Sequence, residues 1–225
     1  MTKILVINPN SSQKMTNDIE ASLLGQENVE VIRISAAPEV LESFADYTYA
    51  GASVLQKLSG MDLQQYSGIL LACFGDPCLY ALKEKVNISV IGIAEAALSR
   101  ALLMGYRFSV AAASKKAVPM MESMIRLYGL QARNAGTVSL EMEIRDFLNQ
   151  KDFLYNRLCL AAKLARKKGA DILILGCAGM TMIDIKQLSA DADIEIIDPV
   201  LNGVSTLRAM IVDGNRISKC GLYHE

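Results

Sequence analysis

The sequence nearly lacks histidine, the side chain most often used for acid–base catalysis near neutral pH and for metal binding. Its one histidine, His224, is the second-last of 225 residues, a position where chains usually fray. A Ser-His-Asp triad, a Cys-His dyad and a histidine-rich metal site would each have to use that residue. We therefore expect neither histidine-based catalysis nor a bound metal.

An excess of one charge sign is also missing. The chain has 23 basic and 24 acidic residues, for a formal net charge of −1, whereas a general nucleic-acid binder needs a concentrated basic face. Its longest run without a charged residue, Leu63 to Gly75, has 13 residues and is too short to cross a bilayer. The first strand-like run begins at once, so we expect no signal peptide. We expect a cytoplasmic protein without nucleic-acid or membrane partners.

Low-complexity tracts and long like-charge runs are absent as well, which argues against large disordered regions. The chain does contain 52% hydrophobic residues, enough for a sizeable core. A length of 225 residues allows one large domain or two small ones.

Short apolar runs alternate along the chain with segments of helical period. Several runs are apolar at consecutive positions, which is typical of parallel strands covered on both faces. One helical segment places Leu154, Leu158, Ala161 and Ala165 on a single face, and Gly169 follows as a stop. The alternation predicts an α/β fold with parallel sheets. The predicted strands are Lys3–Asn8, Val29–Ser35, Gly68–Ala72, Ser89–Ile93, Arg107–Ala112, Gly136–Leu140, Asp171–Gly176 and Ile194–Asp198.

The second half of the sequence repeats the first at a shift of 104 residues. This shift places KILVIN on RFSVAA and GILLACFG on DILILGCAG, and it drifts to 106 toward the end of each half. The alternative is that any two β-α units resemble each other to this degree. We interpret the repeat as two similar α/β domains. Their predicted bounds are residues 1–97 with 200–225 for the first domain and residues 98–199 for the second.

Two of the five cysteines occupy equivalent positions of this repeat. Cys73 in LLACFGDP and Cys177 in LILGCAGM each end an apolar strand and precede small residues and a helix start. Ligands of open α/β sheets bind beyond the carboxyl ends of the strands, and free N–H groups at a helix start favour a thiolate. We expect both thiols to face a cleft, with a pKa lowered from about 8.5 toward neutrality. The alternative is that each cysteine is a small buried hydrophobic residue.

The remaining polar features near these turns have more than one interpretation. Cys78 lies five residues after Cys73, so a redox pair is an alternative, although the spacing is not the C-x-x-C of thioredoxin-like sites. Cys159 and Cys220 have no motif around them, and an odd number of cysteines argues against a disulfide framework. The loop from Asn8 to Ser12 follows the first strand; its side chains can cap the next helix and can also bind a ligand.

These motifs resemble those of the aspartate/glutamate/hydantoin racemase superfamily, most closely its hydantoin/allantoin racemase branch. The resemblance spans nearly the whole chain and implies two pseudo-symmetric α/β domains with the ligand in the cleft between them. It also implies proton transfer without a cofactor, a small-molecule substrate and a homo-oligomer. The segments that carry it are INPNSSQKMT, ACFGDP, VIGIAEAA, LGCAGM and Asp198-Pro199-Val200.

The resemblance implies site residues as well. It makes Cys73 and Cys177 the catalytic pair. Two positions depart from the family pattern: a common Thr-Thr pair is replaced by Ala112-Ala113, with Ser114 next, and a common glycine is replaced by Cys78. The expected substrate-binding residues are Asn8, Asn10, Ser43, Phe74, Gly75, Ala112, Ala113, Ala178 and Gly179.

Together these observations predict a cofactor-independent isomerase that racemises 5-substituted hydantoins or allantoin. One cysteine, as thiolate, removes the proton next to a carbonyl, the other returns a proton to the opposite face, and backbone N–H groups at the turns stabilise the enolate. Ring amides acidify that carbon, whereas the carboxylate of a free amino acid opposes further negative charge. The alternatives are an amino-acid racemase, a decarboxylase or a cis–trans isomerase of the same superfamily, a two-lobed small-molecule binding protein, and a thiol redox protein.

Overall fold

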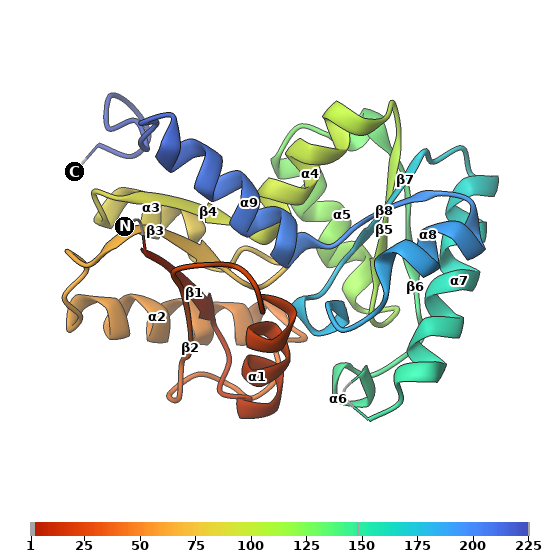
Figure 1. The fold of residues 1–225 in the computed structure, drawn as a ribbon, viewed down its shortest axis with the longest axis horizontal. Helices are drawn as coiled ribbons and strands as arrows, with labels where there is room; N and C mark the ends of the chain where they lie inside the picture. The colour runs from red at the N-terminus through yellow and green to blue at the C-terminus, as the bar shows by residue number, and fades with distance from the viewer. Residues whose placement is uncertain (1–2, 148, 225) are drawn as a thin grey trace.

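A computed structural model describes residues 3–147 and 149–224, and in it the chain forms two halves with the same topology (Figure 1). All eight predicted strands are confirmed, with ends that differ by at most two residues. The strands are β1 (Lys3–Asn8), β2 (Val29–Arg33), β3 (Tyr66–Leu71), β4 (Ser89–Gly92), β5 (Phe108–Ala112), β6 (Asn134–Ser139), β7 (Ile172–Leu175) and β8 (Glu195–Ile197).

The strands form two four-stranded parallel sheets, as predicted. The strand order is β2-β1-β3-β4 in the first sheet and β6-β5-β7-β8 in the second. The register reproduces the repeat and its drift, because Gly68 pairs with Ser89 while Ile172 pairs with Glu195. The shift between the halves is therefore 104 residues in the third strand of each and 106 in the fourth.

Helices connect the strands, and their ends follow local rules. Ser12 caps the first helix by accepting a hydrogen bond from Met15 N. Gly169, at a φ of +81°, ends the helix predicted from the Leu154 to Ala165 face. The α-helices are α1 (Gln13–Ser22), α2 (Phe44–Ser59), α3 (Leu79–Lys85), α4 (Ile93–Met104), α5 (Ala117–Leu127), α6 (Ile144–Phe147), α7 (Lys151–Lys167), α8 (Ile185–Ala192) and α9 (Pro199–Val212), with short 3-10 helices η1 (Gln131–Arg133) and η2 (Ala178–Met180).

Apolar side chains form three layers of core. Helices α2 and α3 cover the outer face of the first sheet, and α7 and α8 cover the outer face of the second. Between the sheets lies a shared cluster to which α1, α4, α5 and α9 contribute. Because both faces of each sheet are covered, β7 is apolar throughout and β1 is apolar from Ile4 to Ile7.

The last helix returns to the first half. α9 packs against β3, β4 and α4, and α4 and α9 lie side by side at the junction (Figure 1). The domain bounds given above stay a prediction, and this packing agrees with the assignment of residues 200–225 to the first domain. In the described ranges, no helix combines the length and the apolar character needed to cross a membrane.

Candidate active site

A small cavity of about 50 Å³ lies between the halves, at the carboxyl ends of the central strands. The first sheet contributes the turn after β3, and the second contributes the turn after β7 and the end of β5. The predicted arrangement of two cysteines at equivalent strand ends around one cleft is thus present. Of the residues proposed from the sequence, those in its wall are Asn10, Cys73, Phe74, Ala113, Cys177 and Ala178.

Five other proposed residues lie behind this wall. Asn8 is fully buried and donates from Nδ2 to Asn10 Oδ1 and Thr16 Oγ1, both at 2.9 Å. Ser43 caps α2 and exchanges hydrogen bonds with Asp46. Their direct binding of substrate stays a prediction, but the first role of Asn8 is to hold Asn10 in the wall.

The remaining three residues shape the turns. Ala112 is buried inside the sheet, and only its neighbour Ala113 reaches the cavity. Gly75 leaves room for the ring of Tyr47, which a Cβ there would overlap. Gly179 donates its N–H to Cys177 Sγ at 3.4 Å. Contact of these three residues with the substrate stays a prediction, as it does for Asn8 and Ser43.

The thiols do not have the lowered pKa expected from the sequence. Burial raises the pKa of Cys73 to about 12, with the nearby Cys177, Asp76 and Cys78 adding to the rise. Burial raises the pKa of Cys177 to about 11, and the charge of Glu42 raises it further. The N–H groups of the turns do act in the expected direction, because those of Gly75 and Gly179 lower the two thiol pKa values. It is outweighed by the loss of water around each sulfur.

The turn after β3 is tied to the other half by a buried carboxylate. Asp76 accepts hydrogen bonds from Ala94 N at 3.2 Å and Glu95 N at 2.9 Å, and so satisfies the start of α4. It also accepts a hydrogen bond from Tyr128 Oη at 2.8 Å, at the end of α5. Burial raises the pKa of Asp76 to about 7, although these donors lower it. Gly92 is required here because a Cβ would overlap the carboxylate.

Several wall residues were missed by the sequence reasoning. Tyr47 comes from the middle of α2 and Ile144 from α6, neither of which ends a strand. The segment around Glu42-Ser43 does reach the cavity, as expected, but through Leu41 and Tyr47. Tyr47 reaches the cavity because its ring packs on Gly75. A single sequence does not reveal that these two residues are in contact. The missed residues are Met15, Leu41, Tyr47, Ala72, Ala117, Met121, Ile144 and Gly176.

A mostly apolar groove continues from the cavity between α2 and α5. Tyr47, Phe74 and Met121 belong to both walls. Met124 and Leu127 line the groove farther out. A molecule in the cavity that carries a large apolar substituent therefore has space beyond the thiols.

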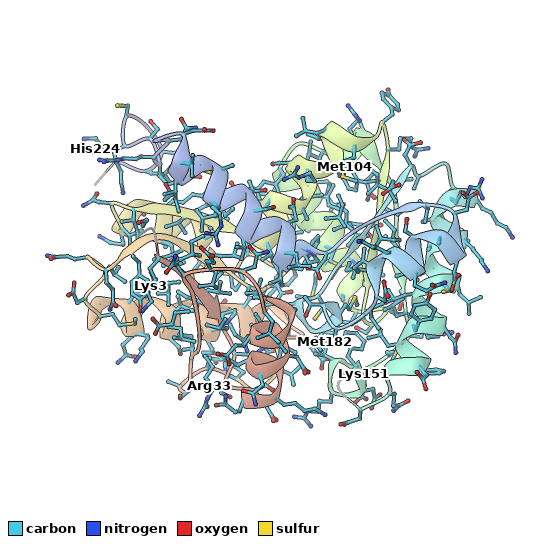
Figure 2. The ribbon with its side chains drawn as sticks, in the orientation of Figure 1. Lys3, Arg33, Met104, Lys151, Met182 and His224 are labelled. Atoms are coloured by element: carbon cyan, nitrogen blue, oxygen red, sulfur yellow. The ribbon has the colours of Figure 1, made fainter. Side chains whose placement is uncertain are left out.

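The other cysteines and the histidine lie elsewhere. Cys78 adopts a left-handed φ of +57° and packs against Gly51, and it is a free thiol like Cys73. His224 lies at the outer end of the first half, whereas Met182, shortly after the Cys177 turn, lies at the junction (Figure 2). Among residues 3–147 and 149–224, no group of three or more His, Cys, Asp or Glu side chains is placed to hold a metal ion.

Three comparisons with known proteins agree with this geometry. The sequence profile of the Asp/Glu/Hydantoin racemase family matches residues 4–207. A hydantoin racemase from Pseudomonas sp. (strain NS671) is 29% identical, over 98% of this chain and 90% of its own. The structure of an allantoin racemase from Klebsiella pneumoniae has a TM-score of 0.92 and 26% identity, covering 99% of this chain and 93% of its own.

A more distant structure has the same fold. A glutamate racemase from Bacillus anthracis is 16% identical with a TM-score of 0.67, covering 96% of this chain and 84% of its own. The profile match spans both sheets and both cysteine turns. From this match and the two cysteines facing one cavity, we conclude that the chain belongs to the Asp/Glu/hydantoin racemase family.

Proposed function

We propose that the protein racemises 5-substituted hydantoins by proton transfer between two cysteines. The observation that carries this proposal is the placement of Cys73 and Cys177 at equivalent strand ends, in the wall of one cavity. Two opposed thiols can serve the two faces of a carbon held between them. The similarity to a hydantoin racemase and an allantoin racemase supports the same reaction class.

The proton balance closes on the two cysteines. The thiolate of one removes the proton from the ring carbon, and the C–H electron pair moves into the adjacent carbonyl to form an enolate. The thiol of the other then gives its proton to the opposite face of the same carbon and becomes the thiolate. The reverse reaction exchanges the roles of Cys73 and Cys177. No cofactor is needed to take up a proton or an electron.

The raised pKa values set the cost of the reaction. At pH 8, a thiol with a pKa of about 11, like that of Cys177, is ionised in about one molecule in a thousand. The thiolate that does form is a stronger base than an ordinary one, because the cavity solvates it poorly. Hydrogen bonds from the Gly75 and Gly179 N–H groups reduce the cost of forming it.

The cavity wall favours a neutral, apolar substrate. Among its described residues, the wall has no lysine, arginine or histidine, so the carboxylate of a free amino acid would find no charged partner and would lose its hydration. A hydantoin ring is neutral before the proton leaves. Its 5-substituent could extend along the groove past Met121 toward Leu127. We therefore place 5-benzyl- and 5-isobutylhydantoin ahead of allantoin, aspartate and glutamate.

The test is exchange of the reacting proton with solvent deuterium, followed by NMR on these five compounds. We expect exchange and loss of optical rotation with the two apolar hydantoins, and the rate should survive dialysis against EDTA. Exchange with aspartate or glutamate alone would show that the substrates are amino acids and not hydantoins. A protein that binds the hydantoins without exchanging the proton would be a binding protein and would overturn the proposal.

We also propose that the protein works in the cytoplasm as a homo-oligomer. The chemistry requires reduced thiols, which the cytoplasm maintains, and the family resemblance favours an oligomer. Light scattering on the purified protein measures the oligomer directly. A monomer at all concentrations would contradict that part of the proposal.

A further inference from the structure

The Tyr47 hydroxyl is a polar group of the cavity wall whose hydrogen-bonding capacity the protein leaves unused. Tyr47 is half-buried in α2, and its ring occupies the space beside Gly75. Within the described ranges, Tyr47 Oη makes no hydrogen bond with another protein group. Because Tyr47 lines the cavity, its hydroxyl is available to a molecule bound there.

The other polar side chain of the wall, apart from the thiols, is already held by the protein. Asn10 Oδ1 accepts hydrogen bonds from Asn8 Nδ2 and Ser12 N, both at 2.9 Å. Asn10 Nδ2 donates to Met15 Sδ at 3.2 Å. These contacts fix the orientation of the Asn10 amide and use its acceptor oxygen, which leaves Tyr47 as the unengaged hydroxyl.

The glycine N–H groups of the two turns serve the sulfurs. The Gly75 N–H lowers the pKa of the Cys73 thiol, and the Gly179 N–H donates to the Cys177 sulfur at 3.4 Å. They stabilise each thiolate, so they are engaged before the substrate proton moves. The negative charge that then appears on the substrate oxygen needs a different donor.

The position of Tyr47 suits that charge. Burial raises the pKa of its hydroxyl well above the ordinary value, and the charges of Cys73 and Cys177 are the next largest causes. The hydroxyl therefore keeps its proton at neutral pH, and Tyr47 lines the same cavity as Cys73 and Cys177. A carbon that reacts with both sulfurs lies between them, and the oxygen of its enolate is only two bonds away.

We propose, resting on the racemisation proposed above, that Tyr47 Oη donates a hydrogen bond to the substrate carbonyl oxygen that becomes negatively charged when the α-proton leaves. The enolate is the same whichever cysteine removed the proton, so one donor serves both directions. A hydrogen bond to an anion is stronger than one to a neutral carbonyl. The contact therefore stabilises the transition state more than the bound substrate.

The experiment compares wild type with Tyr47→Phe, which keeps the ring on Gly75 and removes only the hydroxyl. With 5-benzylhydantoin, we expect kcat to fall about 10²- to 10³-fold and KM to change less than about threefold. The fall should be equal for both enantiomers, unlike that of either cysteine variant. The matched control is Tyr49→Phe, because Tyr49 is exposed on the same helix and should keep wild-type rates.

A ground-state analogue separates catalysis from structure. 5,5-Dimethylhydantoin has no proton on the reacting ring carbon, and Tyr47→Phe should bind it as wild type does, with an unchanged Tm. A kcat within threefold of wild type would overturn the role of Tyr47 and assign the charge to backbone N–H groups. Parallel losses of analogue binding and Tm would show a structural role instead. No exchange by wild type would overturn the proposed function, and with it this inference.

Discussion

The two cysteine turns occupy equivalent places in the two sheets, yet they differ in almost every surrounding contact. Cys177 is the N-cap of the short helix η2 and accepts a hydrogen bond from Gly179 N. The Cys73 turn is longer and includes left-handed residues at Asp76 and Cys78. The repeat therefore places the two sulfurs but does not give them equal chemistry.

The electrostatic difference follows from which groups each turn gathers. Cys73 has Asp76, Cys78 and Cys177 nearby, and each of them raises its pKa in addition to burial. Cys177 has Glu42 as its neighbouring charge. The pKa of Cys73 is consequently the higher one, near 12 against about 11. A symmetric scaffold thus holds an asymmetric pair of bases.

The largest expected effect is the loss of racemisation when either sulfur is removed. Cys73→Ser and Cys177→Ser should each lower racemisation by at least about 10³-fold, because a serine hydroxyl is a far weaker acid than a thiol. Each variant keeps one base, so it should still exchange the α-proton of one enantiomer. The two variants should prefer opposite enantiomers, as followed by NMR on resolved 5-benzylhydantoin.

Cys159→Ser is the control, because this thiol lies on α7 and away from the cavity wall. It should racemise like wild type. Full racemisation by Cys73→Ser or Cys177→Ser would remove that residue from the mechanism and end the comparison of two bases.

A second prediction concerns the order in which the thiols ionise. Activity needs one thiolate, and burial raises both pKa values, so kcat/KM should rise about tenfold per pH unit from pH 7 to 10. Exchange by Cys73→Ser, which retains Cys177, should level off near pH 11. Exchange by Cys177→Ser, which retains the more strongly raised Cys73, should level off at a higher pH. A profile that is flat between pH 7 and 9 would show that a thiolate is already formed and that burial does not govern the pair.

A third prediction tests the carboxylate found only in the first turn. Its folded-state pKa of about 7 exceeds the ordinary 3.8, so the stability linked to Asp76 is present below pH 3.8 and lost as the pH rises to 7. Relative to Asp76→Asn, wild type should lose up to about 4 kcal/mol of unfolding free energy across that window. Urea unfolding at several pH values measures it.

Asp213→Asn, at an exposed position, controls for the loss of one charge. Asp198→Asn is the comparison in the second half, since burial raises the pKa of Asp198 to about 6. The loss of unfolding free energy linked to Asp198 should have the same sign and should be complete about one pH unit lower. A difference between wild type and Asp76→Asn that does not change with pH would contradict the raised value.

The fold and the cysteine pair could be predicted because their signals are local or repeated. Apolar runs, Gly169 after α7 and the 104-residue shift each depend on a short stretch of chain. Parallel strands then bring Cys73 and Cys177 each to the carboxyl edge of its own sheet without further information. The shift even reproduced the change in register at β4 and β8.

The missing parts depend on contacts between distant segments. Tyr47 reaches the cavity because α2 packs its ring on Gly75, 28 residues later. Asp76 caps α4 across a turn and meets Tyr128 from the other half. The sign of the thiol pKa shifts depends on how much water each sulfur loses, which competes with hydrogen bonds that the motif does reveal. A single sequence shows neither the contacts between distant segments nor which of the opposing effects on a thiol pKa is larger.

The smallest effect should come from the side chains that follow β5, where the first half has Asn8-Pro9 and the second has Ala112-Ala113. The pair is not one unit, because Ala113 lines the cavity while Ala112 is buried in the sheet. Ser114 does not replace the missing hydroxyls there, since its Oγ accepts a hydrogen bond from Ala117 N at 3.3 Å and lies on a separate outer hollow.

Ala113→Thr should therefore raise kcat/KM for allantoin about tenfold, because one hydrogen bond to a buried polar group contributes about 1–1.5 kcal/mol. The same change should lower kcat/KM for 5-benzylhydantoin, since the added atoms reduce the apolar space. Ala112→Thr should instead cost about 1–3 kcal/mol of stability through overpacking and leave the ratio of the two substrates unchanged. Steady-state kinetics with both substrates and urea unfolding of both variants separate these effects. A substrate ratio moved by Ala112→Thr and not by Ala113→Thr would show that the second half presents its β5 end to the ligand differently from the wall described above.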